Sequence, residues 1–103
     1  MKYEVKIPTE IKIAGHDYEI CRGARINLEL ASNDYRGSHS NLLREIDIRN
    51  DLPPQDISCT FIHEIIHAVD ETFLNNRLSE DNINSLSTGL HQVMEQLGIR
   101  FLV

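Results

Sequence analysis

The sequence predicts a single α+β domain that spans residues 1–103, in which a small, mostly antiparallel N-terminal sheet is followed by two packed helices. Two patterns lead to this prediction. Apolar and polar residues alternate through much of the first half, as in strands with one buried face. In the second half, apolar residues recur every three or four positions, as on amphipathic helices. Strands that precede helices indicate an α+β architecture, and a chain of this length suits one hydrophobic core.

The alternation predicts several short strands in the first half. Strands are expected at residues 3–7, 11–13 and 18–20, and the turn-like "AGHD" between the last two predicts a hairpin. A further strand is expected at 26–30. Residues 31–41, "ASNDYRGSHSN", are rich in turn-forming residues and are expected to form an exposed loop.

The segment "LLREIDIRN", which begins at Leu42, alternates again and predicts one more strand. One of its faces is largely polar, and it follows a long loop, so we expect it at an edge of the sheet. Pro53 and Pro54 then end the strand region.

Two helices are expected in the second half. The first runs from about Gln55 to about Asn75, and "NNRL" is a short break. The second begins after Ser79, a favourable N-cap, and ends near Gly98; "IRFLV" remains as an apolar tail. The apolar stripe expected to bury the second helix comprises Ile83, Leu86, Leu90, Val93, Met94 and Leu97.

The composition argues against several functional classes. The net charge is −6, and the ten Lys and Arg residues are scattered, which argues against nucleic acid or an anionic membrane as principal partner. No apolar run approaches the ~18 residues of a membrane-spanning helix, and the start lacks the apolar segment of a signal peptide. Two cysteines, Cys21 and Cys59, are too few for a disulfide framework. We therefore expect a cytoplasmic protein.

The segment "FIHEIIHAVDE", residues 61–71, carries the strongest functional signal. Side chains four apart on a helix are offset by about 40°, so His63 and His67 project side by side and can reach one ion. Glu64 lies about 100° further round, where its carboxylate can meet a water on that ion without being a ligand. All three avoid the apolar stripe of the helix. The spacing predicts a zinc site; a solvated polar face that binds no metal is the alternative.

Two histidines leave a catalytic zinc site incomplete, because such sites usually have three protein ligands and one open position. We expect the third ligand to be Glu80, which opens the second helix after a short connection and lies at the edge of its apolar stripe. Glu71, Asp81 and His91 are the other candidates, and His91 becomes the main one if the second helix packs differently. Two residues one helical turn beyond the expected ligands could hold them by hydrogen bonds: Asp70 and Asn84.

The two helices resemble the core of gluzincin-type (HExxH) zinc metallopeptidases, most of all the small single-domain forms encoded by phages and mobile elements. The resemblance rests on "FIHEIIHAVD" and "LSEDNINSLSTGLHQVMEQLG", with looser similarity in "IKIAGHDYEI" and "REIDIRNDLPP". It implies a zincin-like fold in which His63, His67 and Glu80 bind zinc and Glu64 is the general base. It also implies that "REIDIRN" is the rim strand along which an extended peptide lies.

These features predict a zinc-dependent metalloendopeptidase that hydrolyses a peptide or protein substrate. Glu64 would take a proton from the water that zinc activates and pass it to the leaving amine. Tyr35, His39 and His91 are candidates to stabilise the oxyanion. The alternative is a latent or non-catalytic zinc-binding module that interacts with a protein partner, with the tail "GIRFLV" filling the cleft or pairing with the rim strand. A third reading is a metal-free protein that acts through its contact surfaces alone.

Overall fold

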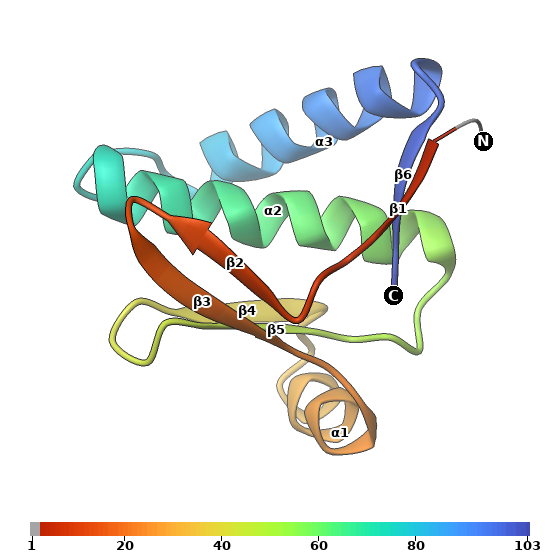
Figure 1. The fold of residues 1–103 in the computed structure, drawn as a ribbon, viewed down its shortest axis with the longest axis horizontal. Helices are drawn as coiled ribbons and strands as arrows, with labels where there is room; N and C mark the ends of the chain where they lie inside the picture. Colours follow the sequence, from red (N-terminus) through yellow and green to blue (C-terminus); the bar gives the residue numbers. More distant parts are fainter. Residues whose placement is uncertain (1–2) are drawn as a thin grey trace.

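Helix α2 lies at the centre of the molecule, between a sheet and helix α3 (Figure 1). The computed structural model describes residues 3–103. In chain order the elements are β1 (Tyr3–Lys6), β2 (Glu10–Ile13), β3 (His16–Cys21), α1 (Ala24–Ser32), β4 (Gly37–Ser40), β5 (Glu45–Ile48), α2 (Pro54–Phe73), α3 (Glu80–Gln96) and β6 (Ile99–Leu102). Helix α1 covers the face of the sheet opposite α2 (Figure 1). The predicted α+β class is confirmed.

The main sheet has the strand order β2-β3-β5-β4. Strands β2 and β3 pair antiparallel, as do β5 and β4, whereas β3 and β5 pair parallel, so the sheet is mixed. The predicted hairpin is confirmed as β2–β3. Its turn uses Ala14 and Gly15 at φ 52° and 80°, and such positive φ values match the twist of a two-residue hairpin turn.

The core lies between this sheet and α2. Alternate residues of β3 and β5 point towards α2, because successive side chains of a strand face opposite sides. Ile20, Ile46 and Ile48 are therefore buried against Ile57 and Phe61 of α2. Burial of one side of α2 holds the helix on the sheet and leaves the His63 side free for other contacts.

The strand predicted at residues 26–30 is wrong, because this segment is part of helix α1. Ile26 and Leu30 are buried, but Leu28 between them is 72% exposed. A spacing of four residues fits one face of a strand and one face of a helix equally well. Good helix formers around these positions, such as Ala24 and Ala31, favour the helix.

The predicted edge strand is also wrong. Strand β5, from "REIDIRN", lies between β3 and β4, and its core-facing Ile46 and Ile48 are fully buried. The outer strand is β4, which falls inside the segment predicted to be an exposed loop. Leu42 and Leu43 lie in the turn between β4 and β5 and are 91% and 71% exposed.

The second half matches the prediction in its elements but not in the packing of α3. Helix α2 is confirmed, and Ser79 caps α3 by accepting a hydrogen bond from the Asn82 N–H at 3.1 Å. The apolar stripe of α3 was expected to be buried. Of its residues only Ile83 is buried, while Leu86, Leu90, Val93 and Leu97 are exposed.

The C-terminal tail forms strand β6, which pairs parallel with β1. Its Phe101 N–H donates to Ser58 Oγ at 2.9 Å, and the Phe101 ring packs on Phe61 with centroids 5.1 Å apart. The tail therefore neither pairs with "REIDIRN", the expected rim strand, nor lines the cleft described below, and that expectation is wrong.

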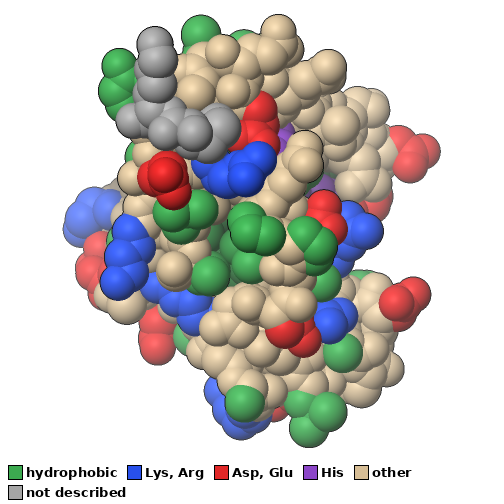
Figure 2. Space-filling view, turned by 90° about the vertical axis from the view of Figure 1, so that its right-hand side faces the viewer, with side chains coloured by type: hydrophobic (Ala, Val, Ile, Leu, Met, Phe, Trp, Pro, Cys, Tyr) green, Lys and Arg blue, Asp and Glu red, His purple; other side chains and the backbone are tan. Residues whose placement is uncertain are grey.

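The length and composition of the helices and the distribution of surface charge both bear on function. Among residues 3–103, no helix combines the length and the apolar character needed to cross a lipid bilayer. On the side of the molecule near the chain's N-terminus, acidic and basic side chains are interspersed with apolar ones (Figure 2).

Candidate metal centre

Three side chains from two helices converge at one point. His63 and His67 lie one turn apart on α2, and Glu80 is the first residue of α3. His63 Nε2 lies 3.1 Å from Glu80 Oε1, and His67 Nε2 lies 2.9 Å from Glu80 Oε2. Tetrahedral zinc with bonds of about 2.0–2.1 Å separates its ligand atoms by roughly 3.3 Å. The two imidazoles and one carboxylate therefore fit a zinc ion after a small outward movement.

Ser87 orients the imidazole of His63. The Ser87 hydroxyl donates to the carbonyl of Asn84 at 3.1 Å, so its oxygen can accept a hydrogen bond from His63 Nδ1–H, 3.3 Å away. With the proton fixed on Nδ1, Nε2 carries the lone pair that a metal requires. Ser87 was not predicted as a site residue. Its signal was its position seven residues after Glu80, on the same face of α3.

Asp70 holds the connection between the two helices instead of a ligating histidine. It is buried, and its Oδ1 accepts a hydrogen bond from the Leu78 N–H at 3.2 Å. The Asp70 carbonyl also accepts from the N–H groups of Leu74 and Asn76. These bonds fix the short turn that brings Glu80 back to the histidines.

Glu64, the expected base, is 4% exposed and lies beside a histidine from the outer strand. His39 Nδ1 donates to Glu64 Oε1 at 3.2 Å, and His39 Nε2 donates to Glu71 Oε1 at 2.8 Å. The hydrogen bond with Glu64, aided by Glu71 and opposed by burial, raises the pKa of His39 to about 9. The His39 ring also stacks on His67, with centroids 4.5 Å apart. A charged His39 thus holds the carboxylate of Glu64 in place.

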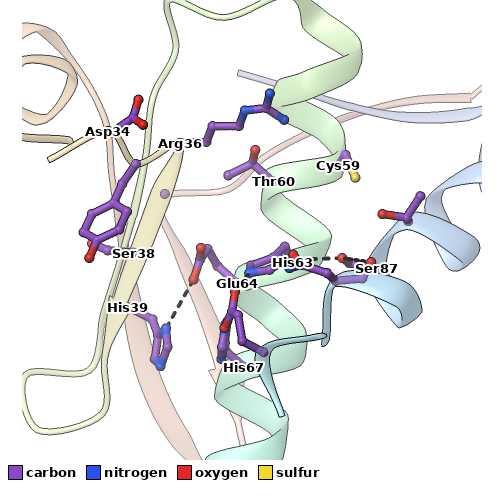
Figure 3. A pocket seen from close by; sticks show the side chains of 15 residues that line it. Asp34, Arg36, Ser38, His39, Cys59, Thr60, His63, Glu64, His67 and Ser87 are labelled. Carbon is purple, nitrogen blue, oxygen red and sulfur yellow. Dashed lines mark hydrogen bonds and ion pairs between the residues drawn. The ribbon is translucent and has the colours of Figure 1, made fainter. Parts of the chain in front are cut away.

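These groups line a cleft between β4, α2 and α3 (Figure 3). One wall is formed by residues 34–39, and the opposite wall includes Cys59, Ser87 and Thr88. Tyr35, a candidate oxyanion stabiliser, lies in the first wall. Cys59 is half-buried in the other wall, and burial raises the pKa of its thiol.

Strand β4 lies against α2 because Gly37 has no side chain. A Cβ on Gly37 would lie 2.7 Å from Thr60 Cγ2 and 3.1 Å from Glu64 Oε2. The outer edge of β4 also faces away from its only partner strand, β5, within the described chain. The Arg49 N–H bonds to the Arg36 carbonyl, and alternation along an antiparallel ladder then points the backbone groups of Gly37 and His39 outward.

The structure does not bring the other ligand candidates to this point. Glu71 instead contacts His39. His39, Glu64 and His67 form a second group with metal-compatible spacing, to which Glu71 does not belong. Asp81 is exposed, and His91 is buried further along α3, facing a separate hollow beside Asp56 and Glu95.

A third cluster lies on the opposite face of the sheet. Ligand-type atoms of Cys21, Glu45 and Asp47 are within 4.8 Å of one another. Burial, together with the neighbouring carboxyl of Glu45, raises the pKa of Asp47 to about 7. Burial and the same acidic neighbours raise the pKa of the Cys21 thiol to about 11. Repulsion between the carboxyl groups of this cluster therefore affects the free energy of unfolding.

Comparisons with protein-family models, with curated proteins and with solved structures gave no match to this chain. The chemistry of the cleft is therefore the basis on which a function can be proposed.

Proposed function

We propose that the chain is a zinc-dependent peptidase that hydrolyses peptide bonds, with His63, His67 and Glu80 as ligands and Glu64 as the general base. The observation that carries this proposal is the convergence of two imidazole nitrogens and one carboxylate beside a buried second carboxylate. Two histidines and one carboxylate, with one position left open, are a typical ligand set of catalytic zinc.

A zinc ion held by these residues would lower the pKa of a water molecule towards neutrality and polarise the substrate carbonyl. Glu64 would accept the water's proton on its carboxylate and deliver it to the leaving amine. His39 is a positioning residue for this step, because its imidazolium holds Glu64 Oε1 from the β4 side. Ser87 keeps the His63 proton on Nδ1, away from the metal.

The substrate that best fits the cleft is an extended peptide. The outward backbone groups of Gly37 and His39 could pair with such a peptide as an added strand, which places its backbone along the cleft beside Glu64. The rim strand is therefore β4 in this proposal. The thiols of Cys21 and Cys59 are free, which suits a reducing compartment such as the cytoplasm.

The test is to measure zinc content and peptide cleavage together. Purified protein supplied with zinc is expected to bind one ion and to cleave an unstructured peptide library read by mass spectrometry. Glu64→Gln should keep the zinc and lose activity by roughly 10²–10⁴-fold, the usual contribution of a general base. Asp81→Asn, which alters an exposed acid next to Glu80, is the matched control and should retain both.

Three results would change this conclusion. Cleavage that survives Glu64→Gln would contradict the assigned base. Zinc bound without cleavage of any peptide would favour the alternative, a zinc-binding module that contacts a protein partner. A chain that takes up no zinc would remove the hydrolytic function altogether.

A further inference from the structure

Helix α3 contacts the rest of the chain along one narrow row of side chains. Its buried positions are Ile83, Ser87 and His91, each four residues apart. A surface helix normally turns its apolar stripe towards the core. In α3 two of the three buried residues are polar, because the helix is rotated to bring Glu80 and Ser87 to the metal centre.

This rotation leaves the apolar residues of α3 facing outward. Leu86, Leu90, Val93 and Leu97 are 45%, 50%, 53% and 62% exposed. Their spacing of four, three and four residues is that of a seam between two packed helices. Single exposed leucines are common, but a continuous row of them marks an interaction surface. We call these four residues the α3 face.

A glycine beside this row indicates what covers it. Gly89 lies in the middle of α3, where glycine is less favourable than alanine. A Cβ built on Gly89 would meet nothing within 4 Å, so the packing of the single chain gives no reason for a glycine there. A missing side chain on an exposed helix allows a second helix to approach closely.

The charge of α3 favours a second copy of the same chain over an unrelated partner. Residues 82–94 contain no Asp, Glu, Lys or Arg, although the chain as a whole carries a net charge of −6. Two copies can therefore meet at the α3 face without placing acids against acids. A partner selected by charge would instead need charged residues around the leucine row.

We propose that the protein forms a homodimer in which the α3 faces of two copies pack antiparallel about a two-fold axis. Leu86 then lies opposite Leu97 of the partner subunit, and Leu90 lies opposite Val93 of the partner subunit. The antiparallel arrangement places opposite ends of the two helix dipoles side by side, whereas a parallel one would place like ends together.

The dimer leaves the metal cleft open. The residues that α3 contributes to the cleft, which are Glu80, Asn84, Ser87 and Thr88, are separate from the α3 face. The inference therefore does not depend on the proposed peptidase function, and dimer formation and zinc binding can fail independently.

The experiment is sedimentation equilibrium of the full chain from micromolar to millimolar concentration. The expected mass is twice the 11.8 kDa of one chain. Leu90→Glu should raise the dimer Kd by roughly 100-fold or more, because each dimer would then bury two unpaired carboxylates. Leu28→Glu, the same change at a 72%-exposed leucine of α1, is the matched control and should leave the Kd unchanged.

A second variant tests the close approach at Gly89. Gly89→Ala should raise the helix content and thermal stability of the isolated chain, yet increase the dimer Kd roughly tenfold because the added methyl separates the helices. Circular dichroism and zinc content show whether each variant is folded. A wild-type chain that stays monomeric up to millimolar concentration would overturn the proposal and leave the α3 face to a different protein. A Leu90→Glu dimer as tight as the wild type would also overturn it.

Discussion

Two residues of the site, Ser87 and His39, orient their neighbours through hydrogen bonds. Ser87 orients the proton of His63, and His39 holds the carboxylate of Glu64, although neither would touch the ion. Hydrogen bonds of this kind usually decide whether a metal ligand presents the correct nitrogen. The motif residues were predictable from their spacing on one helix. Ser87 was not identified in advance, and His39 was named only as a candidate to stabilise the oxyanion, because their contacts depend on how α3 and β4 pack on α2.

The residue outside the site with the clearest energetic effect is Asp47. Its pKa is raised from 3.8 to about 7, so between these values the folded chain keeps a proton that the unfolded chain releases. The contribution of Asp47 to the free energy of unfolding should therefore fall as pH rises from about 4 to about 7 and stay level above that. Asp47→Asn removes the loss of stability that ionisation of Asp47 causes. The melting temperature of this variant should exceed that of the wild type at pH 8, and the difference should shrink towards pH 4.

Thermal unfolding at several pH values measures this effect. Glu45→Gln is the companion variant, since it removes the neighbouring carboxyl and should narrow the pH dependence of the wild type. Equal melting temperatures for Asp47→Asn and wild type at pH 8 would show that the folded structure does not raise the pKa of Asp47.

Some helices and strands could be predicted from local sequence patterns, whereas others depend on tertiary packing. The hairpin β2–β3, helix α2 and the Ser79 cap follow from short-range signals and were predicted. Helix α1 was missed because a spacing of four residues fits a strand and a helix alike. Strand β4 was missed because its residues, "GSHS", have the composition of a loop. Pairing with β5 and the close approach of Gly37 to α2 create this strand, and neither is visible in a local window.

The contact between β4 and α2 gives a prediction about one element. Gly37→Ala would place a methyl 2.7 Å from Thr60 Cγ2, which forces the strand and the helix apart. We expect a loss of about 1–3 kcal/mol in the free energy of unfolding, as in other overpacked cores. The proposed peptidase activity should fall further than the loss of stability explains, because Glu64 Oε2 would lie beside the same methyl.

Urea unfolding and a peptide cleavage assay measure the two effects. Ser38→Ala, at the next position of β4, is the control, because its side chain points to the other face of the strand. A Gly37→Ala chain with unchanged stability would mean that β4 can move away from α2 without cost.

For the whole molecule, the proposed zinc site joins helices α2 and α3 through His63, His67 and Glu80. Binding to the folded chain alone stabilises it by about 2.7 kcal/mol when zinc is at 100 times its Kd. For a domain of this size that corresponds to a rise of roughly 10 °C or more in melting temperature. Glu80→Gln should lose most of this rise, whereas Asp81→Asn should keep it.

Differential scanning calorimetry with zinc and with a chelator measures the rise. A melting temperature that does not respond to zinc would contradict the ligand set, whatever the activity of the chain. If Glu80→Gln keeps the zinc-dependent rise in melting temperature, a residue other than Glu80 is the third ligand.

The pairing of β1 with β6 has a consequence for the order of assembly. The hairpin β2–β3 joins neighbours along the chain and can form within microseconds. Strands β1 and β6 come from opposite ends of the sequence, and β6 also supplies the Phe101 N–H that Ser58 accepts. Contacts between such distant segments form slowly, because the intervening chain must first be ordered. We therefore expect β1 and β6 to pair only after the hairpin β2–β3 has formed.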